Sequence, residues 1–114
     1  MALSEFTRKL IETKLDRYCD QRVPEFAKDQ VQLTYKIKGN DVTLYEKRRA
    51  YFDPDKWSKM PIVQFRYNTN SAKWSLYWAD RNSKWHLYLE LPPNTDFDVL
   101  LKELDKDRTG IFYG

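Results

Sequence analysis

The chain of 114 residues carries a net charge of +3, is 16% aromatic and contains only three glycines, which excludes a disordered or low-complexity protein. No apolar run approaches the roughly 18 residues of a membrane span, and the first residues lack the hydrophobic region of a signal peptide, so we expect no membrane association. The length predicts one domain, residues 1–114, with a single core. The lone Cys19 excludes an internal disulfide and favours the reducing cytoplasm.

The spacing of apolar residues predicts an amphipathic helix over residues 3–20. Apolar side chains recur there every three or four positions, with charged residues between them. Ser4 is placed to cap the first turn, and Pro24 marks the end of the helix or the connection beyond it.

Residues 30–38 alternate between polar and apolar side chains, which is typical of a strand with one buried face. Gly39 and Asn40 both tolerate positive φ and therefore predict a tight two-residue turn. A second strand then pairs back, with Val42 and Leu44 on the buried face.

The segment 52–61 interrupts this alternation with two prolines and is predicted to be an irregular loop, with Trp57 and Met60 covering an edge of the core. Residues 62–68 resume the alternation as a third strand. Arg66 is expected on its outward face.

The aromatic-rich segment 73–90 predicts the hairpin around which the sheet is built. In its first strand, the residues expected to face the core are Trp74, Leu76 and Trp78. After a turn at residues 80–83 the alternation resumes, and the residues expected to face the core are Trp85, Leu87 and Leu89.

Two consecutive prolines, at 92 and 93, end the fifth strand, and Thr95 is predicted to cap a second helix. The apolar stripe of that helix is Phe97, Leu100, Leu101 and Leu104. Its acidic residues are interpreted as a solvated face; they are Asp98, Glu103, Asp105 and Asp107. Ile111 and Phe112 make the tail too apolar to be free in solvent, so it is expected to dock, as a short edge strand or otherwise.

These elements predict an α+β fold: a five-stranded antiparallel meander with an N-terminal and a C-terminal helix packed on one face. Five strands about 4.8 Å apart span roughly 24 Å, whereas two helices about 10 Å wide cover roughly 20 Å. Both helices are therefore needed on one face, and the other face is left open.

By alternation, the open face carries basic and aromatic side chains, which are Lys36, Lys38, Tyr45, Lys47, Arg66, Tyr77, His86 and Tyr88, with Glu90 at one end. Tyrosine and arginine are enriched in protein interfaces, and the same residues stack bases and contact phosphates in nucleic-acid sites. The leading hypothesis is a non-enzymatic binding module whose binding residues are Tyr45, Lys47, Arg66, Tyr77, His86 and Tyr88. A protein partner or a second copy of the chain ranks ahead of nucleic acid.

The alternative hypothesis is a small enzyme in which His86 acts as general acid or base and Arg66 holds an anion. His86 would need an orienting partner from a neighbouring strand. No metal site and no cofactor are expected, because one histidine and one distant cysteine do not form a zinc set, and the chain has no glycine-rich phosphate loop.

Several motifs between Gln30 and Gly114 resemble a known family. They are Phe65-Arg66-Tyr67, Trp74-x-Leu76-Tyr77-Trp78, Trp85-His86-x-Tyr88, Pro92-Pro93 and the closing segment 109–114. On these motifs the chain resembles the short bacterial proteins catalogued as domain of unknown function number three thousand and twenty-four. The resemblance implies a single bacterial cytoplasmic domain, sometimes encoded on mobile DNA. It implies no activity, cofactor or catalytic residue.

Overall fold

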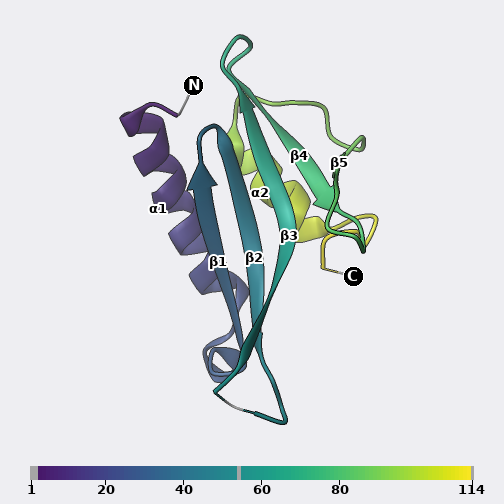
Figure 1. Cartoon of the computed structure of the whole chain (residues 1–114). Coiled ribbons are helices and arrows are strands. Elements are labelled where there is room, and N and C mark those ends of the chain that lie inside the picture. Colours follow the sequence, from purple (N-terminus) through teal and green to yellow (C-terminus); the bar gives the residue numbers. More distant parts are fainter. Residues whose placement is uncertain (1–2, 54, 114) are drawn as a thin grey trace.

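The computed structural model describes residues 3–53 and 55–113, and within them the strands form one antiparallel sheet in the order β1-β2-β3-β4-β5 (Figure 1). The elements, in chain order, are α1 (Glu5–Arg22), a short 3-10 helix (Glu25–Ala27), β1 (Val31–Lys38), β2 (Asp41–Arg49), β3 (Trp57–Asn68), β4 (Lys73–Ala79), β5 (Trp85–Leu87) and α2 (Phe97–Lys106). Both helices lie behind the same face of the sheet. The predicted α+β meander with terminal helices on one face is confirmed.

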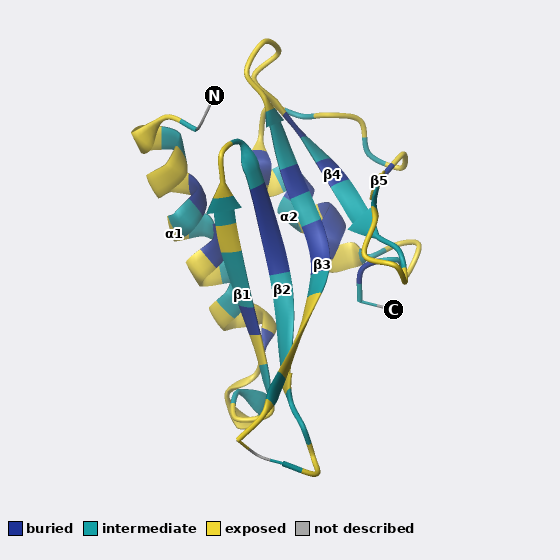
Figure 2. Cartoon of the chain, in the orientation of Figure 1, coloured by how far each residue is buried: buried dark blue, intermediate teal, exposed yellow. Residues whose placement is uncertain are grey.

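The hydrophobic core fills the space between the sheet and the two helices. Its fully buried members are Ile11, Leu15, Val42, Leu44, Val63, Phe65, Leu76, Leu100 and Leu104. Figure 2 shows this buried material along the middle of the sheet and on the helix surfaces that meet it. Each such side chain contributes about 1.5–3 kcal/mol by leaving water, so the helix-covered face of the sheet carries most of the stability.

The N-terminal helix begins where predicted, because the Ser4 Oγ accepts a hydrogen bond from the Thr7 amide at 3.2 Å. Its buried stripe is narrower than expected. Ile11 and Leu15 are buried, whereas Phe6 is 78% and Leu10 is 45% exposed. The helix therefore covers the sheet with one line of residues.

Strand β3 begins at Trp57, so the prediction of an irregular loop is wrong for residues 57–61. Met60 is 64% exposed and does not cover the core. Pro61 lies opposite Tyr45, and the register shifts there because Ile62 is an extra residue. A bulge tolerates proline, which has no amide hydrogen to donate to the ladder. The prolines at 54 and 61 had suggested a break in the strand. Residue 54 lies outside the described residues, and Pro61 lies within β3.

Strand β5 faces the opposite way from the prediction and ends at Leu87 instead of running to the prolines. Leu87 is 45% and Leu89 82% exposed, whereas Tyr88 is 3% exposed. The Asp80 amide donates to the Lys84 carbonyl at 2.9 Å, so the hairpin loop holds three residues and not the four expected. Ser83 makes this possible with a φ of 62°.

The change of one residue in the loop reverses every side chain of β5, because successive residues of a strand point to opposite faces. His86 consequently pairs with Trp78, on the helix side of the sheet. Strand β4 keeps its predicted facing, with Trp74 and Leu76 buried. The error is therefore confined to β5.

The C-terminal segment differs from the prediction at its helix cap. Asp96, not Thr95, is the N-cap, and its Oδ1 accepts from the Asp98 amide at 2.9 Å. The tail docks as expected, with Phe112 only 7% exposed, but it forms no strand in the described residues up to 113. Its closing Gly114 lies outside the described residues.

Candidate functional site

The open face of the sheet is defined by the residues whose side chains alternate with the core. Thr43 alternates with Val42 and Leu44 and lies opposite Gln64, and the same pairing continues across the sheet. The polar and aromatic members of this open face include Lys36, Lys38, Asp41, Thr43, Tyr45, Lys47, Arg49, Trp57, Lys59, Gln64, Arg66, Lys73 and Tyr77. Trp85 of β5, which was predicted to face the core, lies opposite Ala79 on the same face. No described helix covers it (Figure 1).

The charges of the open face are almost all of one sign. Among the described residues of the strands, the acidic side chain that the register assigns to this face is Asp41. Glu46 belongs to the helix-covered face, since it lies opposite the buried Leu33, and it pairs there with Arg48. The face is therefore far more basic than the net charge of the chain suggests.

Cations lie over aromatic rings in the centre of the open face. The Arg66 guanidinium lies 3.9 Å from the centroid of Tyr77, and the Lys59 Nζ lies 4.2 Å from the centroid of Tyr45. A ring attracts a cation through its negative face without neutralising it. These lysine and arginine side chains are therefore oriented while their charge remains available.

A third aromatic ring extends this arrangement toward the end of β2 and β3. Trp57 has the Arg49 guanidinium 5.1 Å and the Lys47 Nζ 5.7 Å from its ring centroid. Trp57 and Lys59 were not predicted to lie on this face, because the segment 52–61 was expected to be a loop. The sequence carried little signal for their position, because residues 57–61 do not alternate between polar and apolar side chains.

A chain of hydrogen bonds fixes Arg66 between neighbouring strands. Its Nε donates to the Gln64 Oε1 at 2.6 Å, and the Gln64 Nε2 donates to the Thr43 Oγ1 at 3.0 Å. Arg66 and Tyr77 also line a broad hollow that reaches Asp41. Tyr45, Lys47, Arg66 and Tyr77 are thus brought together on one face, as predicted.

His86 lies on the helix side of the sheet and not on the open face. Its ring stacks on Trp78 with 4.5 Å between centroids, and its Nε2 lies 2.8 Å from the Asp80 Oδ2. That hydrogen bond, with the Lys84 amide, lowers the pKa of Asp80 to about 2. Asp80 is the orienting partner that the sequence could not identify, and the same carboxylate organises the hairpin loop.

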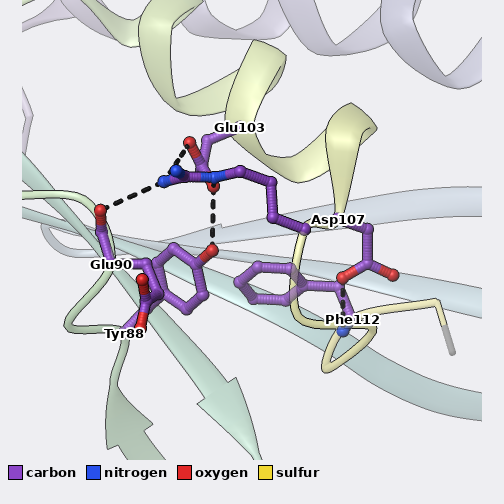
Figure 3. Close-up of polar contacts among 6 residues, drawn as sticks. Tyr88, Glu90, Glu103, Asp107 and Phe112 are labelled. Carbon is purple, nitrogen blue, oxygen red and sulfur yellow. Dashed lines mark hydrogen bonds and ion pairs between the residues drawn. The ribbon is translucent and has the colours of Figure 1, made fainter.

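Tyr88 is buried against α2 and is therefore also misplaced in the prediction. Its hydroxyl donates to the Glu103 Oε2 at 2.8 Å, and the Arg108 Nε donates to the same oxygen at 2.8 Å (Figure 3). Arg108 also donates to the carbonyl of Glu90, which binds the end of the β5 segment to α2. Glu103 is 7% exposed, so its interpretation as part of a solvated helix face is wrong.

In this cluster (Tyr88, Glu103 and Arg108) the tyrosine and the carboxylate are buried, whereas the arginine reaches them from the surface. Burial alone would raise the pKa of Glu103, but hydrogen bonds from Arg108 and Tyr88 hold that pKa below its usual value. Burial, together with the bond to Glu103, raises the pKa of Tyr88. The tail is fixed beside the cluster, because Phe112 packs on Tyr88 and the Phe112 amide donates to Asp107 (Figure 3). The Tyr113 amide donates to the same carboxylate.

The geometry does not assemble the enzyme that the sequence suggested. Arg66 alternates with the core residue Phe65 and points to the open face, whereas His86 lies opposite Trp78 on the other face. The two side chains therefore cannot act on one substrate. Over residues 3–53 and 55–113, no group of three or more histidine, cysteine, aspartate or glutamate side chains is arranged to hold a metal ion.

Comparison with known proteins adds a family and no activity. A family model described as Domain of unknown function (DUF3024) matches residues 3–114, which extends the resemblance through the N-terminal helix. No curated protein and no solved structure matches the chain. In the part of the chain that the structure describes, the helices are too short or too polar to cross a membrane.

Proposed function

Since the chain belongs to this family of unknown function, we propose from its geometry that it is a single-domain, non-enzymatic binding module of the bacterial cytoplasm, and that its open face holds single-stranded nucleic acid. The observation that carries the proposal is the set of cations held over Tyr45, Trp57 and Tyr77 on a face with one acidic residue.

Single strands are recognised by two kinds of contact, and the open face offers both. Lysine and arginine neutralise the backbone phosphates, and aromatic rings or guanidinium planes stack on exposed bases. The pairs Arg66–Tyr77 and Lys59–Tyr45 place a cation and a ring at the same point of the sheet. A base can extend such a stack while the neighbouring phosphate meets the other cations.

Charge also favours nucleic acid over the other partners. In a two-fold dimer the same patch meets itself, so an open face whose cations include Lys47, Lys59 and Arg66 would oppose an identical set. That arrangement is repulsive, which disfavours self-association through this face. A protein partner would have to be acidic. Its carboxylates would pair with the cations of the open face, but they would not stack on the exposed rings.

The test measures fluorescence anisotropy of a labelled oligothymidylate of about 20 nucleotides, long enough for a typical single-strand site. We expect affinity to fall as salt rises from about 50 to 200 mM, with a log–log slope near −0.7 for each phosphate contact. Arg66→Gln and Lys59→Gln should each weaken binding. Lys9→Gln, which removes the same charge from the exposed side of α1, is the matched control and should not.

Two results would contradict this function. One is a folded wild-type protein that binds no oligonucleotide even at low salt. The other is a dimer in solution that Tyr77→Asp converts into monomers, because this would make the open face a seam between copies.

A further inference from the structure

The β2–β3 loop, residues 50–56, exposes two adjacent aromatic side chains at the end of the molecule. Tyr51 is 98% and Phe52 is 75% exposed, and their rings meet edge to face with centroids 5.7 Å apart. We call these two residues the tip pair. Full exposure of two neighbouring rings has no stabilising role in the described structure, and such a patch is typical of a contact surface.

Backbone hydrogen bonds join described residues on either side of the tip pair. The Ala50 amide donates to the Lys56 carbonyl at 2.9 Å, and the Lys56 amide donates to the Asp53 carbonyl at 3.0 Å. The ladder below it is also intact, with Arg49 opposite Trp57. A ring held between such hydrogen bonds loses less conformational freedom on binding than a ring on a slack segment.

The position of the loop makes it a continuation of the open face. Pairing between β3 and β4 begins at Val63, so the part of β3 nearer the loop extends beyond β4. In Figure 1 the loop lies at the lower end of the molecule, below the end of α1, and Figure 2 shows it mostly exposed. Trp57, with Arg49 over its ring, joins the tip pair to the tyrosines of the open face.

The charges around the loop indicate what the tip pair contacts. Arg49 and Lys56 lie at its base, whereas Asp53 and Asp55 lie within it. The Asp53 Oδ1 already accepts from the Asp55 amide. Phosphates are therefore attracted to the base of the loop and repelled from its end. The group that contacts the tip pair should consequently be uncharged and flat.

We propose that the tip pair stacks on a base of the bound single strand, at the end of the track that begins on the open face. This inference rests on the proposed function and assigns the loop as its second contact. It predicts that an oligonucleotide must be long enough to pass from the open face to the loop before the tip pair contributes.

The experiment compares a Tyr51→Ala/Phe52→Ala double variant with wild type on long and short oligothymidylates, of about 20 and about 4 nucleotides. Stacking on one base is worth a factor of roughly 5 to 150 in affinity, so the double variant should bind the long oligonucleotide at least about fivefold more weakly. Binding of the short one, which the open face can hold alone, should be unchanged. Tyr51→Phe keeps the ring and should bind as wild type does.

Phe6→Ala is the matched control, because Phe6 is 78% exposed on α1 but lies far from the loop in sequence. It should leave both affinities unchanged. Equal binding of the long oligonucleotide by wild type and the double variant would overturn the role of the tip pair while leaving the proposed function intact. Absence of binding by wild type itself, or binding of anionic vesicles instead, would overturn both.

Discussion

Each face of the sheet combines a tyrosine and an arginine with a third polar side chain, and the two combinations have opposite results. On the helix-covered face, Tyr88 and Arg108 both donate to Glu103. On the open face, Arg66 lies over Tyr77 and donates to Gln64. The first group contains a carboxylate where the second contains an amide.

That difference decides what each group can do. The half-exposed Arg108 and the Tyr88 hydroxyl both donate to Glu103, so the buried carboxylate has the partners that offset the cost of its burial. Gln64 orients Arg66 but leaves its charge unbalanced, which is tolerable only on a face that stays in contact with water or with an anion. One face is thus built to be closed, and the other keeps a fixed cation available.

The largest effect on stability should come from truncating a leucine on the helix-covered face, compared with truncating a leucine on the open face. Leu76 is 1% exposed on the helix-covered face, whereas Leu87 on β5 is 45% exposed on the open face. Leu76→Ala should lower the free energy of unfolding by about 2–5 kcal/mol, because it leaves a cavity. Leu87→Ala should change it by less than about 0.5 kcal/mol. Urea denaturation measures both, and equal losses would contradict the facing of β5.

The sequence predicted the facing of β2 and β4 because their alternation depends only on short, recognisable turns. Gly39-Asn40 fixes the first hairpin and shows in composition alone. The loop before β5 could not be predicted in the same way. Its length depends on Ser83 adopting positive φ and on Asp80 accepting two amides, and neither follows from residue type.

The candidate site was predicted only where the facing of the strand was predicted. Tyr45, Lys47, Arg66 and Tyr77 lie on strands of correct register and are brought together as expected. His86 and Tyr88 were lost with the facing of β5. Trp57 and Lys59 were missed because two prolines suggested a loop, whereas a bulge absorbs the second.

An intermediate effect should follow from removing the charge of the buried network. Glu103→Gln keeps the shape of the side chain but leaves the Arg108 guanidinium without its carboxylate, and it should cost about 1–3 kcal/mol. Thermal denaturation at neutral pH measures the loss. An unchanged melting temperature would show that Arg108 is compensated by solvent, since it is partly exposed.

The pH dependence identifies the same group. The pKa of Glu103 is lowered in the folded protein, so its stabilising contribution is complete above the unfolded-state pKa of about 4.3 and is lost as pH falls through the folded-state pKa. The pKa of Asp80 is also lowered, but wild type and Glu103→Gln share Asp80, so its contribution cancels when the two proteins are compared. The difference in stability between wild type and Glu103→Gln should therefore shrink on acidification below about pH 4, and a constant difference would contradict the assignment.

The smallest effect on stability, and the most specific effect on binding, should come from placing a carboxylate beside an arginine of the open face, as on the helix-covered face. Gln64→Glu places a carboxylate beside the Arg66 Nε, where the Gln64 Oε1 now accepts at 2.6 Å. An ion pair on a water-exposed surface is worth about 0–1 kcal/mol, so unfolding should hardly change. The charge of Arg66 would nevertheless be balanced within the protein. Oligonucleotide affinity should then fall, and the log–log salt slope should shrink by about 0.7, the value of one phosphate contact.

Thr43→Val is the control variant, because it removes the other end of the hydrogen-bond chain without adding charge and so separates the charge of Arg66 from its orientation. If Thr43→Val reduced the salt slope as much as Gln64→Glu, the orientation of Arg66 and not its free charge would distinguish the two faces.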